Sequence, residues 1–165
     1  MAPQAKRLAL DTNLPLDLAE GIDAAHAFRE QFQEKGYALL VPPTVVTELT
    51  LKADDESDPK RAKLAMRALQ SLRKWGIQPY DLKSVGHGIT SEFARRLIER
   101  GLLPEGEFND GVIMAETALA GIPVLVTSDR HLLDIPNEGL QLELSAADLN
   151  PVSIAHPRRL LKALH

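Results

Sequence analysis

The sequence has no cysteine, which excludes disulfides, thiolate zinc sites and cysteine nucleophiles. The absence of cysteine fits the reducing cytosol, so we expect a cytoplasmic protein. No run approaches the roughly 18 apolar residues that a membrane span requires. The apolar run before Asp11 is too short for the apolar region of a signal peptide. We therefore expect no association with a membrane.

A net positive charge is also missing, because the formal charge is −4 and the pI is about 5.7. This argues against a protein that coats nucleic acid through bulk positive charge. A nuclease remains compatible, since an acidic catalytic centre lowers the total while basic helices occupy one face. A glycine-rich phosphate loop is absent, because GHGI at 86–89 has neither the spacing nor the following lysine. We interpret Gly86 and Gly88 as turn residues.

The composition that is present is that of one globular domain. The chain has 165 residues, of which 44% are hydrophobic and 25% charged, as in ordinary folded proteins. There is no internal repeat, low-complexity stretch or linker. We expect a single domain over residues 1–165, with a basic helical tail from about residue 157.

Short apolar strands alternate with amphipathic helices along the chain, and this predicts an α/β fold with a parallel sheet between layers of helices. The strands are expected at 7–11, 37–42, 77–80 and 123–128, with an edge strand at 140–144, where LQLEL alternates. The helices are expected at 22–35, 44–53, 58–75, 89–100 and 109–119, with a short one beginning at 129 and another in the tail.

Four acidic residues fall at informative places in this pattern. Asp11 and Asp129 each follow a buried strand, Asp110 begins a helix, and Glu48 lies within the apolar segment VVTELTL. Each has an ordinary structural explanation as well. The aspartates are preferred N-caps or favourable charges in a first helical turn, and a glutamate can sit partly exposed on an amphipathic helix.

The carboxyl ends of parallel strands meet at one edge of a sheet, where ligands bind in open α/β folds. Two carboxylates about 4 Å apart repel by roughly 4 kcal/mol at an effective dielectric constant of 20. Several acids gathered there need a cation or shared protons. Oxygen ligands without histidine or cysteine favour Mg²⁺ or Mn²⁺.

Four segments resemble the motifs of PIN-domain nucleases and occur in the same order. They are LALDTN (8–13), VPPTVVTEL (41–49), FNDGVIMAETALAG (108–121) and VLVTSDRHL (124–132). The resemblance implies a three-layer α/β/α sandwich with a mainly parallel sheet of about five strands. It implies that the metal-binding and catalytic acids are Asp11, Glu48, Asp110 and Asp129. It also places Thr12 or Asn13, and Thr127 or Ser128, where they steady ligands or the attacking water.

The commonest small members of this family are ribonuclease toxins that an antitoxin neutralises, and small PIN proteins often pair. The resemblance therefore implies an RNA substrate, an antitoxin partner and a homodimer, for which the apolar faces of residues 43–75 are candidates. Single-stranded DNA stays open as a substrate, since hydrolysis by water does not require the 2′-hydroxyl. The chain is longer than the usual toxins and carries a basic segment from Pro157.

Basic residues are the expected contacts to the substrate. Arg130 directly follows Asp129 and is the best placed, and further candidates are Lys60, Lys63, Arg67 and Lys74 on one helix face, Arg95, Arg96 and Arg100 on another, and Arg158 and Arg159 in the tail. The plain alternative is that these clusters are ordinary solvated faces.

Three other functions compete with the metal-dependent nuclease. A metal-free ribonuclease would use a histidine pair such as His87 and His131, although their spacing gives no signal. A phosphatase or phosphoacceptor would use Asp11 as nucleophile, but Asn13 stands where a second aspartate is expected. A PIN-like scaffold would bind RNA or protein without cutting.

Overall fold

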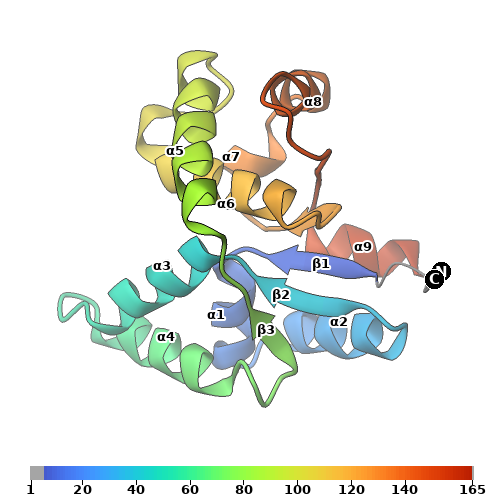
Figure 1. Ribbon diagram of the computed structural model, residues 1–165. Helices are drawn as coiled ribbons and strands as arrows, with labels where there is room; N and C mark the ends of the chain where they lie inside the picture. The colour runs from blue at the N-terminus through green and yellow to red at the C-terminus, as the bar shows by residue number, and fades with distance from the viewer. Residues whose placement is uncertain (1–5, 165) are drawn as a thin grey trace.

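The computed structural model describes residues 6–164, which form one five-stranded sheet with helices on both faces (Figure 1). All the strand pairings are parallel, and the strand order is β3-β2-β1-β4-β5. The strands are β1 Arg7–Leu10, β2 Ala38–Val41, β3 Ile77–Pro79, β4 Val124–Val126 and β5 Ser153–Ala155. The predicted three-layer α/β/α class and the number of strands are confirmed.

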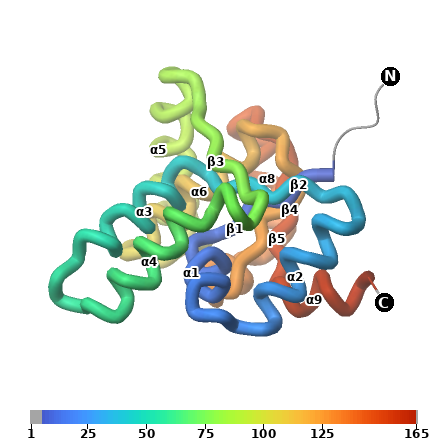
Figure 2. The backbone as a smooth tube through the Cα atoms, turned by 90° about the horizontal axis from the view of Figure 1, so that it is seen from below, coloured from blue at the N-terminus to red at the C-terminus, as the bar shows by residue number. Residues whose placement is uncertain are grey.

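The helices divide between the two faces of the sheet. Figure 1 shows α5 to α8 on one side and α1, α2 and α4 on the other, and Figure 2 shows α9 beside α2. Their bounds are α1 Asn13–Glu20, α2 Asp23–Glu34, α3 Pro43–Ala53, α4 Pro59–Ser71, α5 Ser84–Glu99, α6 Phe108–Leu119, α7 Arg130–Leu133, α8 Asn137–Ala146 and α9 Pro157–Ala163. A short 3-10 helix, Glu105–Glu107, leads directly into α6.

The strand order creates a switch point between β1 and β4. The chain builds outward from β1 to β2 and β3, then crosses back to place β4 on the other side of β1. Connections that leave β1 and β4 in opposite directions open a crevice beyond their carboxyl ends, and ligands of open α/β sheets bind in such crevices. The fold therefore directs the residues after these two strands into one crevice.

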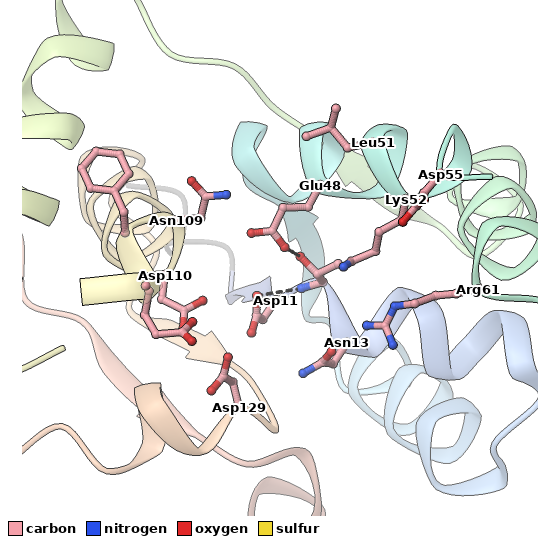
Figure 3. Close-up of a pocket in the computed structure, with 14 residues that line it drawn as sticks. Asp11, Asn13, Glu48, Leu51, Lys52, Asp55, Arg61, Asn109, Asp110 and Asp129 are labelled. Carbon is pink, nitrogen blue, oxygen red and sulfur yellow. Dashed lines mark hydrogen bonds between the residues drawn. The ribbon is translucent and has the colours of Figure 1, made fainter. Parts of the chain in front are cut away.

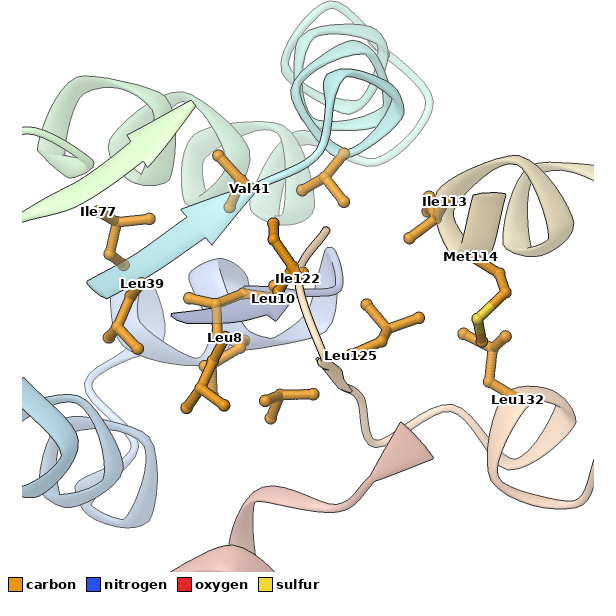
Figure 4. Close-up of a cluster of buried hydrophobic side chains, with 14 of the residues drawn as sticks. Leu8, Leu10, Leu39, Val41, Ile77, Ile113, Met114, Ile122, Leu125 and Leu132 are labelled. Atoms are coloured by element: carbon orange, nitrogen blue, oxygen red, sulfur yellow. The ribbon is translucent and has the colours of Figure 1, made fainter. Parts of the chain in front are cut away.

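The core surrounds the central strand. Leu8, Ala9 and Leu10 of β1 are all buried, because helices cover both faces of the sheet. Figure 4 shows leucine, valine and isoleucine side chains of β1, β2 and β3 meeting in this core. Each fully buried leucine contributes about 1.5 to 3 kcal/mol, so the strand that ends at Asp11 is firmly held.

Gly111 sets the position of α6. A Cβ atom at this residue would lie 2.8 Å from the Cα of Ala94 on α5, closer than carbon atoms approach in packed proteins. Only glycine permits this close packing of α5 against α6. Because Asp110 precedes Gly111, the same contact fixes the height of that carboxylate over the sheet.

Two sequence-based predictions are wrong. Residues 140–144 form part of α8 and not an edge strand, and the edge strand is β5. Leu140 and Leu144 are buried four residues apart on one helix face while Leu142 is exposed. Gly86 and Gly88 lie inside α5, which begins at Ser84, and Gly86 is buried against Leu82, so these glycines are not turn residues.

The other elements agree with the predicted order, with shifted ends. α1 was not predicted; its Pro15 is tolerated because the first turn of a helix has no amide partner to lose. α4 ends at Ser71, and a turn continues to Gly76, where φ is +71°. Over residues 6–164, no helix combines the length and the hydropathy that crossing a bilayer requires.

Candidate metal centre

Three aspartates meet at the switch point of the sheet (Figure 3). Asp11 follows β1, Asp129 follows β4, and Asp110 lies in the first turn of α6. Each offers a carboxylate oxygen, and these three oxygens lie within 4.8 Å of one another. The acids that were distant in the sequence are therefore close enough to share one ion.

Asp11 is the most firmly held of the three. Its Oδ2 accepts a hydrogen bond from Thr127 Oγ1 at 2.7 Å, and its Oδ1 accepts one from the Thr12 amide at 2.8 Å. The side chain is buried. Burial raises the pKa of Asp11 to about 6, against the lowering effect of the two hydrogen bonds and with a further rise from the charges of Glu48 and Asp129.

Asp110 is buried without a complete set of partners. Its Oδ2 has no hydrogen-bond partner among the described residues. Burial, followed by the negative charges of Asp11 and Asp129, raises the pKa of Asp110 well above its ordinary range. A buried carboxylate oxygen with no donor needs an explanation such as a proton or a bound ion.

Asp129 has two roles. Its Oδ1 accepts a hydrogen bond from the His131 amide at 2.8 Å and so caps α7, which is the ordinary role of an aspartate at this place. Its own amide donates to Thr127 Oγ1 at 2.9 Å. Thr127 therefore joins Asp11 and Asp129, and capping α7 does not remove Asp129 from the cluster.

Glu48 reaches the same site from α3 but lies outside the group of three. Its Oε2 accepts a hydrogen bond from Thr12 Oγ1 at 2.6 Å, and Figure 3 shows the side chain pointing toward Asp11. Thr12 and Asn13 line the cleft together with the acids. Ser128 is different, because it lines a separate pocket beside His156 and Arg158.

The donor set fits a hard divalent cation. The three aspartates offer oxygen atoms only, and no histidine belongs to the group that the described residues form. Such ligands favour Mg²⁺ or Mn²⁺ over softer metals. The partnerless Oδ2 of Asp110 is the atom that a cation would satisfy.

The acids lie in a cleft of about 620 Å³. Two basic side chains line it, Lys52 from α3 and Arg61 from α4. The ten basic residues predicted from the sequence as substrate contacts, all described by the structure, do not line the cleft. They are Lys60, Lys63, Arg67, Lys74, Arg95, Arg96, Arg100, Arg130, Arg158 and Arg159. Arg67 instead donates to the carbonyl oxygen of Ala19 at 3.2 Å.

Several residues that line the cleft were not predicted from the sequence. Glu107, Phe108 and Asn109 line the cleft because the 3-10 helix delivers them beside Asp110. The one hint in the sequence was that Phe108 and Asn109 stand directly before Asp110 in the FND segment. Lys52 and Arg61 depend on how α3 and α4 pack, which no local pattern reveals.

The histidines proposed for a metal-free ribonuclease each lie beside an acidic side chain. His87 Nε2 is 3.4 Å from Asp81 Oδ1, and His131 Nε2 is 3.5 Å from Glu107 Oε1. Neither of these described side chains lines the cleft. The arrangement gives no support to a histidine pair as general acid and base.

A buried carboxylate ties two of the helices that carry the acids. Glu116 of α6 is 1% exposed, and its oxygens accept hydrogen bonds from the Thr44 amide at 3.0 Å and from Thr44 Oγ1 at 2.8 Å. Burial raises the pKa of Glu116, while the bonds from Thr44 lower it. Because Thr44 lies in the first turn of α3, Glu116 links the helix of Asp110 to the helix of Glu48.

Replacing Glu116 by leucine should lower the free energy of unfolding by about 1 to 3 kcal/mol, because the Thr44 amide and hydroxyl both lose their acceptor. Glu116→Gln keeps one acceptor oxygen and should cost less than half as much. Urea unfolding at neutral pH measures both values. Equal stability of the parent and the leucine variant would show that the link contributes nothing.

Comparison with solved structures gives matches that cover 72% to 90% of this chain. VapBC2 from Rickettsia felis, bound to a DNA fragment from its promoter, matches with a TM-score of 0.62 and 17% identity over 90% of this chain and 98% of that one. A toxin–antitoxin complex from Klebsiella pneumoniae matches with a TM-score of 0.53 and 18% identity, covering 78% and 92%. The chain has the PIN-domain fold of VapC toxins.

VapC20 from Mycobacterium tuberculosis, a toxin that cleaves the sarcin–ricin loop, shares this PIN fold with a TM-score of 0.50 and 18% identity over 72% of this chain and 86% of that chain. No protein-family model and no curated protein matches the sequence. The PIN fold is thus recognised from the path of the backbone, while the chemistry rests on the side chains described above.

Proposed function

We propose that this protein is an endoribonuclease that hydrolyses RNA phosphodiesters with Mg²⁺ or Mn²⁺. The observation that carries the proposal is the group of three carboxylates within 4.8 Å, in which Asp110 Oδ2 is buried without a partner. RNA is chosen as substrate by likeness to the toxin that cleaves the sarcin–ricin loop. We also propose that the whole chain is one nuclease domain.

Asp11, Asp110 and Asp129 would hold the ion, and Glu48 would complete the acidic site from α3. The bound ion would lower the pKa of a water and stabilise charge on the phosphoryl group at the transition state. Thr127 holds Asp11 in place, and Thr12 holds Glu48. Rigid support of this kind keeps catalytic groups in productive geometry.

Attack by water would form a new oxygen–phosphorus bond as the bond to the 3′-oxygen breaks. The leaving oxygen takes a proton, so the products carry a 5′-phosphate and a 3′-hydroxyl. A histidine-based ribonuclease would instead use the 2′-hydroxyl as nucleophile and would not need a metal. The chemistry of the product ends therefore separates the two mechanisms.

The partners are part of the same proposal. Two of the matching structures are described as toxin–antitoxin or VapBC assemblies, and we propose that an antitoxin binds this chain. We also propose a homodimer in the cytoplasm. Met66 of α4 is exposed, and such a side chain is suited to a surface between subunits.

A cleavage assay tests the function directly. Single-stranded RNA and DNA of one sequence, and a structured RNA, are incubated with Mn²⁺, with Mg²⁺ or with EDTA, and the ends of the products are determined. We expect RNA cleavage with either metal, 5′-phosphate ends, and none with EDTA. Cleavage that survives EDTA would support the histidine mechanism. Binding of RNA without cleavage in any condition would make the chain a PIN-like binding module.

A further inference from the structure

The cleft has an acidic floor and a basic wall. The aspartates lie at the edge of the sheet, while Lys52 and Arg61 come from α3 and α4. Figure 3 shows both basic side chains extending into the cleft from the side opposite Asp110. A ligand that filled the cleft would meet carboxylates at one end and cations at the other.

Both cations lack an anionic partner. Neither Lys52 nor Arg61 forms an ion pair within 4.0 Å among residues 6–164. Lys52 is half-buried and Arg61 is exposed. An unpaired lysine and an unpaired arginine on one wall are a ready site for an anion.

Two acids between Lys52 and Arg61 accept local hydrogen bonds, and one of them, Asp55, also lines the cleft. Asp55 Oδ1 accepts hydrogen bonds from the Ser57 hydroxyl at 2.6 Å and from the Ser57 amide at 2.9 Å. These bonds lower the pKa of Asp55, with a smaller contribution from the charge of Lys52. Asp58 Oδ1 accepts from the backbone amide of Arg61 at 3.1 Å and caps α4. Asp55 and Asp58 are thus held by local hydrogen bonds, and neither forms an ion pair with Lys52 or Arg61.

The cleft also offers apolar surface. Leu51, which is 64% exposed, and the half-buried Phe108 both line it. Aromatic and apolar side chains beside a basic groove suit unpaired bases, since every base has a face that can stack. Asp11 and Asp110 are recessed, with 4% and 7% exposure, so a strand must be free to bend toward them.

We propose that Lys52 and Arg61 bind the phosphate next to the scissile one in a single-stranded RNA. This inference rests on the proposed function, because the acids mark where the cut phosphate lies. Arg61 would contact phosphate oxygens through its planar guanidinium group, and Lys52 would contribute a point charge. Together with the apolar surface of Leu51 and Phe108, the subsite makes unpaired RNA the substrate class.

Salt dependence of binding tests the subsite. Binding of a short labelled single-stranded RNA in EDTA is measured by fluorescence anisotropy between about 50 and 200 mM salt. Each lost phosphate contact reduces the slope of log K against log salt by about 0.7 for a single strand. The Lys52→Gln/Arg61→Gln variant loses its contact to one phosphate and should therefore lose about 0.7 from this slope.

The control is Lys35→Gln/Arg73→Gln, which removes the same charge from two exposed residues outside the cleft. It should leave the slope unchanged, and thermal unfolding checks that both variants are folded. Equal slopes for the cleft pair and the control pair would overturn the subsite. Equal binding of the same RNA as a duplex would overturn the choice of unpaired RNA.

Cleavage kinetics separate this inference from the proposed function. With Mn²⁺, the cleft variant should raise KM by roughly tenfold with kcat nearly unchanged, since the contact is made equally in the ground state and the transition state. If the parent binds RNA but never cuts, and the slope still falls, the nuclease proposal fails and the subsite stands. If the parent cuts and the cleft variant matches it in KM and slope, the subsite fails and the nuclease stands.

Discussion

Asp11→Asn and Asp129→Asn are each expected to reduce the rate of Mn²⁺-dependent RNA cleavage by a factor of about 1,000, because the loss of a ligand removes several kcal/mol of transition-state stabilisation. Asparagine keeps the size of the side chain and an oxygen that can accept from Thr127 or from the His131 amide. The fold should therefore survive. Single-turnover cleavage of a labelled RNA at saturating metal measures the loss.

Asp134→Asn is the matched control, because Asp134 is an exposed aspartate five residues after Asp129 and does not line the cleft. It should cut as fast as the parent. Unfolding temperatures of the three variants check that each is folded. If Asp11→Asn and Asp129→Asn cleave at the rate of the parent, the assignment of these acids to a metal-dependent centre is wrong.

The second large effect is on stability, and it depends on pH. Burial raises the pKa of Asp11 to about 6 and raises that of Asp110 as well, so the folded protein holds these protons more tightly than the unfolded chain does. Their contribution to stability is fully present below about pH 4 and is lost as pH rises through the folded-state values. The metal-free protein should thus lose stability between about pH 5 and pH 8 on account of these groups.

A divalent cation should reverse this loss, because it binds the deprotonated carboxylates. At a concentration about 100 times its dissociation constant, Mn²⁺ adds about 2.7 kcal/mol, which is roughly 5 to 10 °C in Tm for a chain of this length. The shift should be large near pH 8 and nearly absent near pH 5. Differential scanning fluorimetry with and without Mn²⁺ at the two pH values measures it.

Asp110→Asn should raise the Tm of the metal-free protein near pH 8, since it removes one of three crowded carboxylates. It should also abolish most of the Tm increase caused by Mn²⁺, since it removes a ligand of the ion. Glu34→Gln removes the same charge at an exposed site on α2 and should leave both values as in the parent. A Mn²⁺ shift of the same size in Asp110→Asn and in Glu34→Gln would place the ion elsewhere.

Much of the fold follows from local patterns. The runs LAL and VLV are apolar, and an aspartate follows each within three residues, so they predict buried parallel strands that deliver acids to one edge of the sheet. Pro43 marks the start of α3, and Gly121 follows the end of α6. Because the positions of Asp11, Asp110 and Asp129 depend on these short segments, their meeting could be predicted.

Other features depend on contacts that no local pattern contains. LQLEL has leucines at intervals of two and of four, so it fits a strand and a helix equally well, and packing of Leu140 and Leu144 decides for α8. The sequence also does not reveal which charged residues of α4 face the cleft. Whether Arg61 or Lys60 lines the cleft is decided by the rotation of α4 against α3, and the partner of Glu116 lies 72 residues earlier in the chain.

The position of β1 in the middle of the sheet bears on when the proposed nuclease becomes active. The strand order places β4, made late in the chain, directly beside β1, made first, and Thr127 bonds to Asp11 across 116 residues. A partly synthesised chain carries Asp11 and Glu48 but has no Asp129 to set beside them. The proposed site would thus form only after residue 129 has been synthesised, and a chain that terminates earlier would lack it.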